Sequence, residues 1–390
     1  MKLVFSAFRM GAVGGSETYV LTVAEHLQAL GHEVTVHATE MGEAADLARD
    51  RGLRVVADDE LPEACDGVLV QDSVHACLMA ERYPAVPRVF VAHTIHVNIQ
   101  RPPQVDDVVN AVVVLNDRIG QRFAGMAREP ELVRLRQPLD LVRFSPRGRL
   151  NSRPKSALLL GNYLRGDQRD MIVKACTDRG IATTEVGAHG KVSHHPEVAI
   201  CEADVVLGYG RAILEAMSCG RAAYVIGDSG GDGWVTADSY PALEADGFGG
   251  SATPVIIDGA RLARDLGDYE VEMGPVNRHT VSATHGAFAH AADLVALLRR
   301  LAPRAPAEGS LAEVERLTRL QWATEARAQL LGLENEALRD QLQEERANIE
   351  DERGGIRDHW DAVESFKRSR RYRLAQLFGK PIDRLRRRPP

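Results

Sequence analysis

A glycine turn followed by a helix that carries a carboxylate is the part of this sequence best suited to chemistry. It reads Leu207-Gly-Tyr-Gly-Arg-Ala-Ile-Leu-Glu-Ala-Met-Ser-Cys-Gly220. Gly210 and Arg211 open an amphipathic helix, whose first turn offers backbone N–H groups and a positive dipole end to a diphosphate. Glu215 lies on the helix face nearest the turn, where its carboxylate can accept hydrogen bonds from a ribose diol. The segment predicts a nucleotide-binding helix start.

A second glycine turn lies near the N-terminus, between the first expected strand and the first expected helix. It reads Gly11-Ala-Val-Gly-Gly-Ser-Glu17, so Gly14 and Gly15 let a ligand approach backbone N–H groups. The order is not the G-x-G-x-x-G of dinucleotide-binding turns. Glu40 lies near the end of the second expected strand, where an acidic residue can bind a ribose, and this keeps an NAD-dependent enzyme open as an alternative.

Cations are needed where a nucleoside diphosphate leaves, because negative charge develops on it as the glycosidic bond breaks. Arg211 begins the helix that carries Glu215, so we expect it to contact the diphosphate or the sugar. Arg165 and Arg169 follow a strand-end glycine and are further donor-binding candidates, with surface charges as the alternative reading. No Asp-x-Asp motif ends a strand, so neither a metal site nor a cofactor is expected.

Short apolar runs alternate with helical patterns from residue 2 to about residue 300, which is the rhythm of parallel α/β sheets. The boundary between two such units falls near residues 145–154, where prolines and a glycine interrupt regular structure. The expected strands of the first unit are 2–8, 33–38, 54–56, 67–71, 88–92 and 111–115. Those of the second unit are 157–160, 181–186, 205–207, 222–226 and 253–257.

These motifs, in this order, resemble the retaining glycosyltransferases of family 4. The resemblance includes Gly-Gly-x-Glu at Gly14, the strand-end histidine in Val91-Ala-His93, the segment from Asp140 to Pro146, and Leu-Glu-Ala-Met at Glu215. Two positions depart from the family. Leu207 replaces the first Glu of the E-x7-E pair, and Asn162 stands where an arginine usually follows the strand-end glycine.

The resemblance implies a GT-B fold, in which two facing Rossmann-like, doubly wound domains bind a nucleotide sugar between them. It implies transfer of a hexose from a UDP- or GDP-sugar to a glycan, lipid-linked or other acceptor, with retention and without metal. His93 and Glu215 are then the catalytic candidates, and Gly210 and Arg211 bind the donor. The alternative from another class is a catalytically silent GT-B module that binds a nucleotide sugar or glycan and assembles through a coiled coil.

The composition is that of an ordinary protein with an acidic body and a basic end. The chain has 390 residues, 26% of them charged, and a net charge of −7. Residues 367–390 carry a net charge of +9 against −16 for residues 1–366, which argues against nucleic acid as a partner. The odd number of cysteines, 5, without a C-x-x-C pair favours reduced thiols. We therefore expect a cytoplasmic protein, with a role in polysaccharide biosynthesis compatible with the family resemblance.

Five segments are expected along the chain. Residues 1–148 form the acceptor-side domain, 149–301 the nucleotide-sugar domain, 302–309 a linker, 310–352 a coiled-coil helix and 353–390 a basic amphipathic tail. Heptads place Asn335, Leu342 and Ile349 at a positions and Leu331 and Leu338 at d positions, which predicts a homo-oligomer through 310–352. Arginines mixed with aromatic residues over 365–390 suit an anionic membrane surface on the inner face of the cell membrane.

Overall fold

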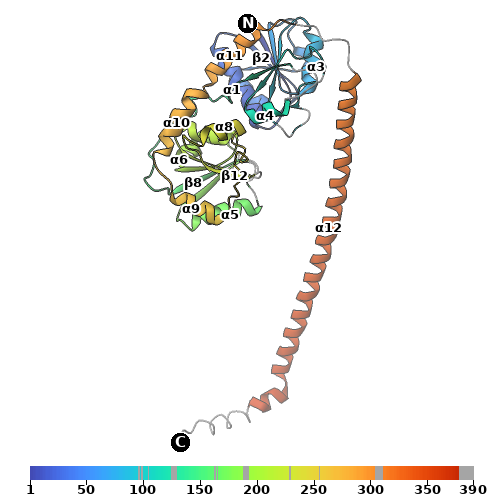
Figure 1. The fold of residues 1–390 in the computed structure, drawn as a ribbon. Helices are drawn as coiled ribbons and strands as arrows, with labels where there is room; N and C mark the ends of the chain where they lie inside the picture. The colour runs from blue at the N-terminus through green and yellow to red at the C-terminus, as the bar shows by residue number, and fades with distance from the viewer. Residues whose placement is uncertain are drawn as a thin grey trace. The chain divides into compact units, whose positions relative to one another are not determined.

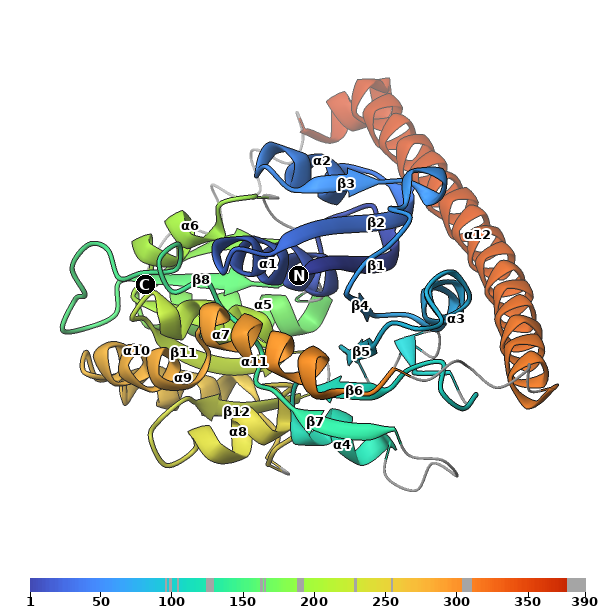
Figure 2. The same ribbon diagram turned by 90° about the horizontal axis from the view of Figure 1, so that it is seen from above.

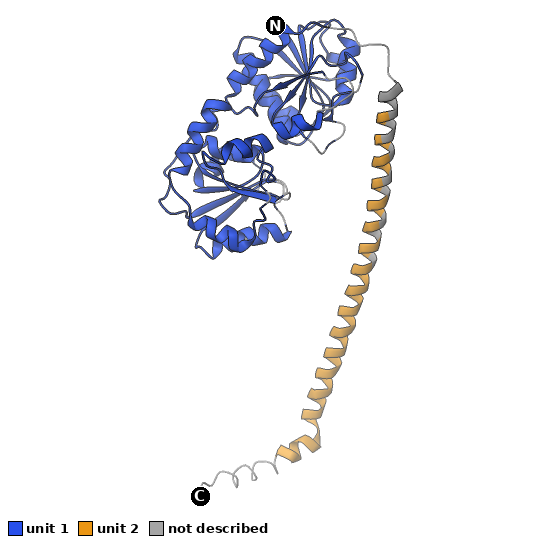
Figure 3. Cartoon of the chain, in the orientation of Figure 1, with its two compact units in different colours: residues 1–313 blue, residues 314–390 orange. Residues whose placement is uncertain are grey.

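The chain divides into two compact units, Met1–Glu313 and Val314–Pro390, each described by itself below (Figure 3). The structure is a computed structural model. It describes residues 1–94, 97, 100–103, 105–123, 130–161, 164, 166–187, 193–227, 230–253, 255–303 and 311–376.

The first unit begins with a parallel seven-stranded sheet in the order β3-β2-β1-β4-β5-β6-β7, which Figure 2 shows strand by strand. Its strands are β1 (Lys2–Met10), β2 (Glu33–Met41), β3 (Arg54–Val56), β4 (Gly67–Val70), β5 (Arg88–Ala92), β6 (Ala111–Val114) and β7 (Glu131–Arg134). The central strands read as nearly continuous apolar runs because both faces of a parallel sheet are buried.

Helices cover both faces of this first sheet. They are α1 (Gly15–Ala29), α2 (Glu43–Asp50), the 3-10 turn η1 (Asp58–Glu60), α3 (Ser73–Arg82) and α4 (Asp117–Phe123). Helix α1 ends at the left-handed Gly31, with a φ of 83° that a residue with a Cβ would adopt only with strain. Figure 1 shows α1 on one side of the sheet and α3 on the other.

The second half of the same unit holds a five-stranded sheet in the order β12-β11-β10-β8-β9. Its strands are β8 (Ser156–Leu160), β9 (Ala182–Val186), β10 (Val205–Gly208), β11 (Ala222–Gly227) and β12 (Gly230–Trp234). Its helices are α5 (Gly166–Thr177), α6 (Pro196–Glu202), α7 (Arg211–Ser218), α8 (Tyr240–Asp246), α9 (Gly259–Gly267) and α10 (Met273–Thr284). The fold class is therefore α/β with two parallel sheets, as the sequence predicted.

Helix α11 (Ala287–Arg300) returns from the second half to the first (Figure 1). Its buried face, which includes Leu294 and Leu298, belongs to the same apolar core as α1 and the first sheet. The Tyr19 hydroxyl of α1 is hydrogen-bonded to His290 Nε2 of α11 at 2.7 Å. By its packing α11 belongs to the first half, although the sequence analysis grouped it with residues 149–301.

Two strand assignments at the edges of the sheets need correction. Residues 253 and 255–257, expected as a strand, are irregular, and Ile256 is 88% exposed. The edge position is taken by β12, which runs antiparallel to β11. Its sequence Gly-Gly-Asp-Gly-Trp has no strand-like pattern, but Trp234 packs edge-on against Tyr224 with ring centroids 5.0 Å apart. Strand β7 was also missed.

The second unit is a long helix, α12 (Leu311–Arg368), followed by a short helical stretch up to residue 376. It runs without a break through residue 352, where the sequence analysis separated a coiled coil from a tail. The rest of the expected basic tail, residues 377–390, lies outside the described residues. Among the helices that the structure describes, none is both long and apolar enough to cross a lipid bilayer.

Candidate functional site

A cavity of about 280 Å³ opens between the two α/β halves of the first unit. From the first half it is lined by Gly15, Ser16, His93, Thr94, Gln100, Leu115, Asn116 and Ile119, and from the second by Gly210, Arg211, Leu214, Glu244, Gly247 and Phe248. Gln137 and His285 complete the lining. The two glycine turns singled out in the sequence therefore meet at one cavity, as do His93 and Arg211.

Two glycines place the start of α7 at this cavity. Gly210 caps the helix with φ 62° and ψ −133°, a conformation that is essentially restricted to glycine. Gly208 passes so close to the β8 backbone that a Cβ would collide with the carbonyl oxygen of Leu160. Gly210 is required by its backbone conformation and Gly208 by the lack of space for a side chain. The Gly-x-Gly pattern therefore allows the chain to turn from β10 into α7. The consequence is a helix N-terminus with its positive dipole end directed at the cavity.

Arg211 and Glu215 form a buried ion pair at the start of α7. The Arg211 Nε donates to Glu215 Oε1 at 2.9 Å, and their side chains are only 12% and 10% exposed. Burial lowers the pKa of Arg211, while the Glu215 carboxylate opposes that shift. Burial also raises the pKa of Glu215, and the guanidinium beside it opposes the rise. The two groups hold each other in the charged state at a site where neither would be stable alone.

The same guanidinium joins the two halves of the unit. Arg211 Nη1 donates to the carbonyl oxygen of Pro138 at 3.1 Å, and Nη2 donates to the Thr22 hydroxyl of α1 at 3.3 Å. Arg211 thus lies at the cavity, and all three of its guanidinium nitrogens have protein partners. Glu215, the candidate for the ribose, is held by Arg211 in this state.

Leu207 does not face the cavity. It lies in β10, is fully buried, and packs in the apolar core of the second half together with Leu159 and Tyr224. The first position of the E-x7-E spacing is therefore a strand position in this chain. A carboxylate there would be desolvated in an apolar core.

The turn at Gly14 and Gly15 is partly satisfied by the chain itself. Glu17 reaches back with its carboxylate and accepts a hydrogen bond from the Gly14 N–H at 3.1 Å, as in a capping box. A Cβ on Gly14 would lie 2.7 Å from that carboxylate, whereas a Cβ on Gly15 would meet nothing within 4 Å. Gly15 is the member of this turn that leaves room for a ligand.

His93 carries an unpartnered polar atom at the cavity. It follows β5, and its Nε2 is buried without a hydrogen-bond partner among the described residues. Its ring packs edge-on against Tyr19, with centroids 4.8 Å apart. Burial, together with the positive charge of Arg211 and the nearby His290, lowers the pKa of His93 to about 3. The imidazole is neutral at physiological pH, and a buried lone nitrogen of this kind favours a ligand hydroxyl as its partner.

Only one of the two other predicted cations is among the described residues. Arg165 lies outside the described residues. Arg169 is on α5, where its Nε donates to Glu185 at 3.0 Å and its Nη1 donates to Asp170 at 2.8 Å. It does not line the cavity.

Sequence reasoning missed the wall of the cavity that α8 and the following loop provide. Glu244 accepts from Arg134 at 2.6 Å, and Asp246 accepts from Arg118 at 3.2 Å, so two ion pairs tie α8 to the first half. Gly247 sits so close to Asn116 that a side chain at this glycine would collide with the amide. These partners are more than a hundred residues apart in the sequence, so no local sequence pattern predicts their contacts.

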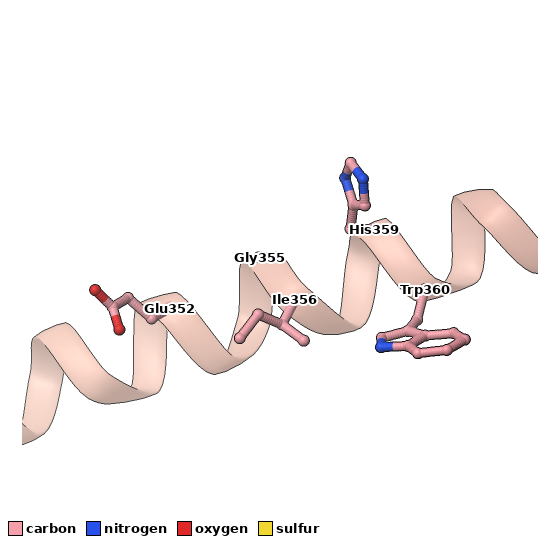
Figure 4. Close-up of a pocket in the computed structure, with 5 residues that line it drawn as sticks. All are labelled: Glu352, Gly355, Ile356, His359 and Trp360. Atoms are coloured by element: carbon pink, nitrogen blue, oxygen red, sulfur yellow. The ribbon is translucent and has the colours of Figure 1, made fainter.

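A second depression lies on α12 alone and is lined by Glu352, Gly355, Ile356, His359 and Trp360. Figure 4 shows His359 and Trp360 projecting from opposite sides of the helix. A depression that one helix lines has no opposing wall, so it cannot enclose a small molecule.

Comparison with known proteins gives the fold. HepE of Anabaena, in a crystal structure with UDP, matches with a TM-score of 0.58 at 13% identity and covers 77% of this chain and 100% of its own. A HepE structure with UDP-glucose gives a TM-score of 0.54 at 13% identity, again over 77% and 100%. The pneumococcal O-GlcNAc transferase GtfA, in complex with UDP and GlcNAc, gives 0.52 at 9% identity over 77% and 98%.

The structural neighbours of the two α/β halves are thus GT-B glycosyltransferases, and the fold is GT-B, as the sequence resemblance implied. No family model matches the sequence, and no curated protein matches it either. The similarity therefore supports the architecture, and the chemistry has to be argued from the cavity.

Proposed function

We propose that this protein is a glycosyltransferase that moves a hexose from a UDP- or GDP-sugar to a glycan or lipid-linked acceptor. The observation that carries the proposal is the cavity between the halves, where the helix start at Gly210 and the turn at Gly15 line one space. UDP is the favoured nucleotide, because HepE and GtfA hold UDP in structures of the same fold.

The start of α7 is the proposed diphosphate site. Its free N–H groups and dipole suit an anion, and the Arg211 guanidinium adds a full positive charge beside them. Donor entry requires Arg211 to exchange Thr22 or Pro138 for phosphate oxygens, while the bond to Glu215 keeps the guanidinium oriented. Glu215 is then available through its second oxygen to the ribose diol. Charge that develops on the leaving diphosphate is stabilised in a site that is already ordered.

His93 is the proposed contact for the donor sugar. Its neutral ring can hydrogen-bond one sugar hydroxyl through the Nε2 that has no protein partner among the described residues. Because the His93 ring is held edge-on against Tyr19, it can fix the position of that sugar hydroxyl.

We also propose that transfer retains the anomeric configuration of the sugar and needs no metal ion. Among the described residues that line the cavity, the carboxylate is Glu244, and it is engaged by Arg134 at 2.6 Å. With Glu244 engaged by Arg134 and Glu215 assigned to the ribose, the departing phosphate is the proposed base that accepts the acceptor's proton. The family 4 resemblance points to the same mechanism.

The test is release of nucleoside diphosphate from a panel of UDP- and GDP-sugars. We expect one donor to be turned over by the wild-type protein, and Arg211→Lys to reduce turnover at least tenfold, since Lys cannot keep the fork that binds Glu215 and phosphate together. Arg169→Lys is the matched control and should turn over like wild type. No release with any donor would reject the enzyme.

A catalytically silent module is the second candidate, and the Arg211–Glu215 pair favours it. In a silent module this pair would serve only to join the halves, through its bonds to Thr22 and Pro138. Nucleotide binding with no turnover across the panel would select this candidate.

Assembly through α12 is proposed from the residues that the helix exposes. Leu331, Leu338, Leu342, Ile349, Ile356, Val363 and Phe366 are all exposed large apolar residues, and all fall at a or d of one heptad register. Ile356 of Figure 4 belongs to this seam, and Trp360, at the following e position, flanks it. We expect Leu342→Lys to dissociate the oligomer in sedimentation velocity. Leu330→Lys, at an exposed position outside the seam, should leave it intact.

A peripheral position on the inner face of the cell membrane, in polysaccharide biosynthesis, completes the proposal. The arginines of the basic end and the exposed Phe366 and Leu374 suit anionic lipid. Removal of residues 365–390 should abolish co-sedimentation with anionic vesicles. Equal co-sedimentation after the truncation would reject the membrane role.

A further inference from the structure

A second cluster of chemically capable side chains lies in the first half, and none of its members lines the cavity between the halves. It consists of His37 on β2, Asp58 on η1 and His75 on α3. One ligand atom from each lies within 4.8 Å of the others. His37 Nε2 and Asp58 Oδ1 are 2.8 Å apart. Three short segments, far apart in the sequence, thus converge on the α3 side of the sheet.

His75 is held in the form that a metal ligand needs. Its Nδ1 is 3.1 Å from Asp72 Oδ1, and a carboxylate can only accept, so Nδ1 carries the proton and Nε2 of the neutral ring carries a lone pair. Asp72 is itself fixed, because it caps α3 and accepts from the backbone N–H groups of Phe8 and His75, each at 2.8 Å. A carboxylate behind a histidine is the usual outer partner of a metal-binding imidazole.

His37 has a comparable partner behind its ring. Its Nδ1 is 2.9 Å from the Ser6 hydroxyl on the neighbouring strand. In this structure Nε2 donates to Asp58 Oδ1, because a carboxylate can only accept, and Nδ1 accepts from the Ser6 hydroxyl. A hydroxyl can also accept, so on metal binding the proton can sit on Nδ1 and leave the Nε2 lone pair to the ion. Both rings are fully buried, with ring centroids 5.2 Å apart, so they cannot turn away from each other.

The Thr39 hydroxyl lies at the centre of the cluster. Thr39, which shares the β2 face of His37, places its hydroxyl 2.9 Å from Asp58 Oδ1 and 3.0 Å from His75 Nε2. Since His37 Nε2 donates to Asp58, the Thr39 proton can go to His75 Nε2, and the three ligand groups form one connected hydrogen-bond network. A cation bound to the three ligand atoms would replace this network and displace the proton of His37 Nε2.

We propose that His37, His75 and Asp58 bind a first-row divalent cation, with Zn²⁺ as the expected ion. Two neutral imidazoles and one carboxylate are a donor set for this class, whereas Mg²⁺ and Ca²⁺ prefer oxygen ligands throughout. The fourth position is left to water or to the Thr39 hydroxyl.

The three ligand atoms lie within 4.8 Å of one another, so the side chains must adjust their separations to bind one ion. Tetrahedral zinc holds its N and O ligands about 3.3 Å from one another, so Asp58 must retreat from His37 by about half an ångström. Asp58 can do so because its side chain is 57% exposed, while His37 stays fixed in the sheet. The ion would join β2, η1 and α3 of the first half. It would stabilise this half without entering the sugar-transfer site.

The test is zinc binding by the full-length protein after dialysis against chelator, measured by equilibrium dialysis and metal analysis. We expect about one Zn²⁺ per chain, a visible absorption spectrum with Co²⁺ in its place, and a rise in the melting temperature when Zn²⁺ is added back. Asp58→Asn should weaken zinc binding by at least about tenfold.

Asp59→Asn is the matched control, since it removes the same charge from the adjacent exposed position of η1 and should bind zinc like wild type. Asp58 is exposed, so its variant should fold even if a His75→Gln variant does not. Less than about 0.2 Zn²⁺ per chain in the wild type, or equal binding by the Asp58→Asn and Asp59→Asn proteins, would overturn the proposal.

Discussion

Replacing Arg211 by Met tests the central contact of the cavity, because it leaves Glu215 buried without its cation. Breaking a buried pair in this way typically costs about 3–5 kcal/mol. Glu215 can limit the cost by taking up a proton. From its ordinary pKa of 4.5 that proton costs about 3.4 kcal/mol at pH 7 and about 0.7 kcal/mol at pH 5, at 1.36 kcal/mol per pH unit.

The sign of the pH dependence follows from proton binding. In the variant, burial without Arg211 raises the pKa of Glu215 in the folded state above its unfolded value, so between these values the folded state binds more protons. Stability relative to wild type is therefore lost as pH rises from 5 to 7. We expect the variant to lose about 3 kcal/mol at pH 7 and to recover most of it, up to about 2.7 kcal/mol, at pH 5.

Urea unfolding of both proteins at pH 5 and pH 7 measures the effect, provided that the transitions are two-state. The double variant Arg211→Met/Glu215→Leu removes the charge along with its partner and should come within about 1 kcal/mol of wild type at both pH values. A single-variant loss below about 1 kcal/mol at pH 7, or one that is the same at both pH values, would refute a desolvated, mutually dependent pair.

Three further predictions concern single positions. Leu207→Glu should destabilise the protein by several kcal/mol and should not raise turnover, because the side chain is fully buried in an apolar core; a stable variant with raised turnover, against Leu207→Met as control, would contradict this placement. His93→Asn should lower the rate of sugar transfer more than it lowers UDP affinity. The ratio of wild-type to variant UDP affinity, measured by calorimetry, should be the same at pH 5.5 and pH 8, because the His93 pKa of about 3 keeps the ring neutral throughout. A ratio that changes near pH 6.5 would show a charged ring. Gly210→Ala should cost about 1–3 kcal/mol and weaken UDP binding, since its φ is 62°, whereas Gly15→Ala, where a Cβ meets nothing within 4 Å, should cost less than 1 kcal/mol by the same unfolding assay.

Much of the fold could be predicted because each buried strand of a parallel sheet is itself an apolar run in the sequence. The apolar runs at β1, β5 and β11 are continuous, and Gly31 ends α1 where its left-handed conformation requires glycine. Strand β12 could not be predicted, since Gly-Gly-Asp-Gly-Trp has no strand-like pattern of apolar residues. Its pairing is accompanied by a contact between Trp234 and the distant Tyr224 that the local sequence does not reveal. The return of α11 to the first core likewise depends on distant contacts such as Tyr19 with His290.

The candidate site could be predicted in its components but not in their pairing. The glycine turns, His93 and Arg211 do meet at one cavity. The spacing of Arg211 and Glu215, four residues apart on a helix, already suits an ion pair, yet sequence reasoning assigned both to ligand. Glu244 and the cluster of His37, Asp58 and His75 come from separate segments and are joined only by the fold.

The most direct test of the proposed donor site is a crystal structure of the protein soaked with UDP. We expect the β-phosphate at the N-terminus of α7, within hydrogen-bond distance of the backbone N–H groups that follow Gly210 and of the Arg211 guanidinium, with Glu215 facing the ribose. UDP bound elsewhere, or a cavity that stays closed by Arg211 and Thr22 at saturating UDP, would contradict this expectation.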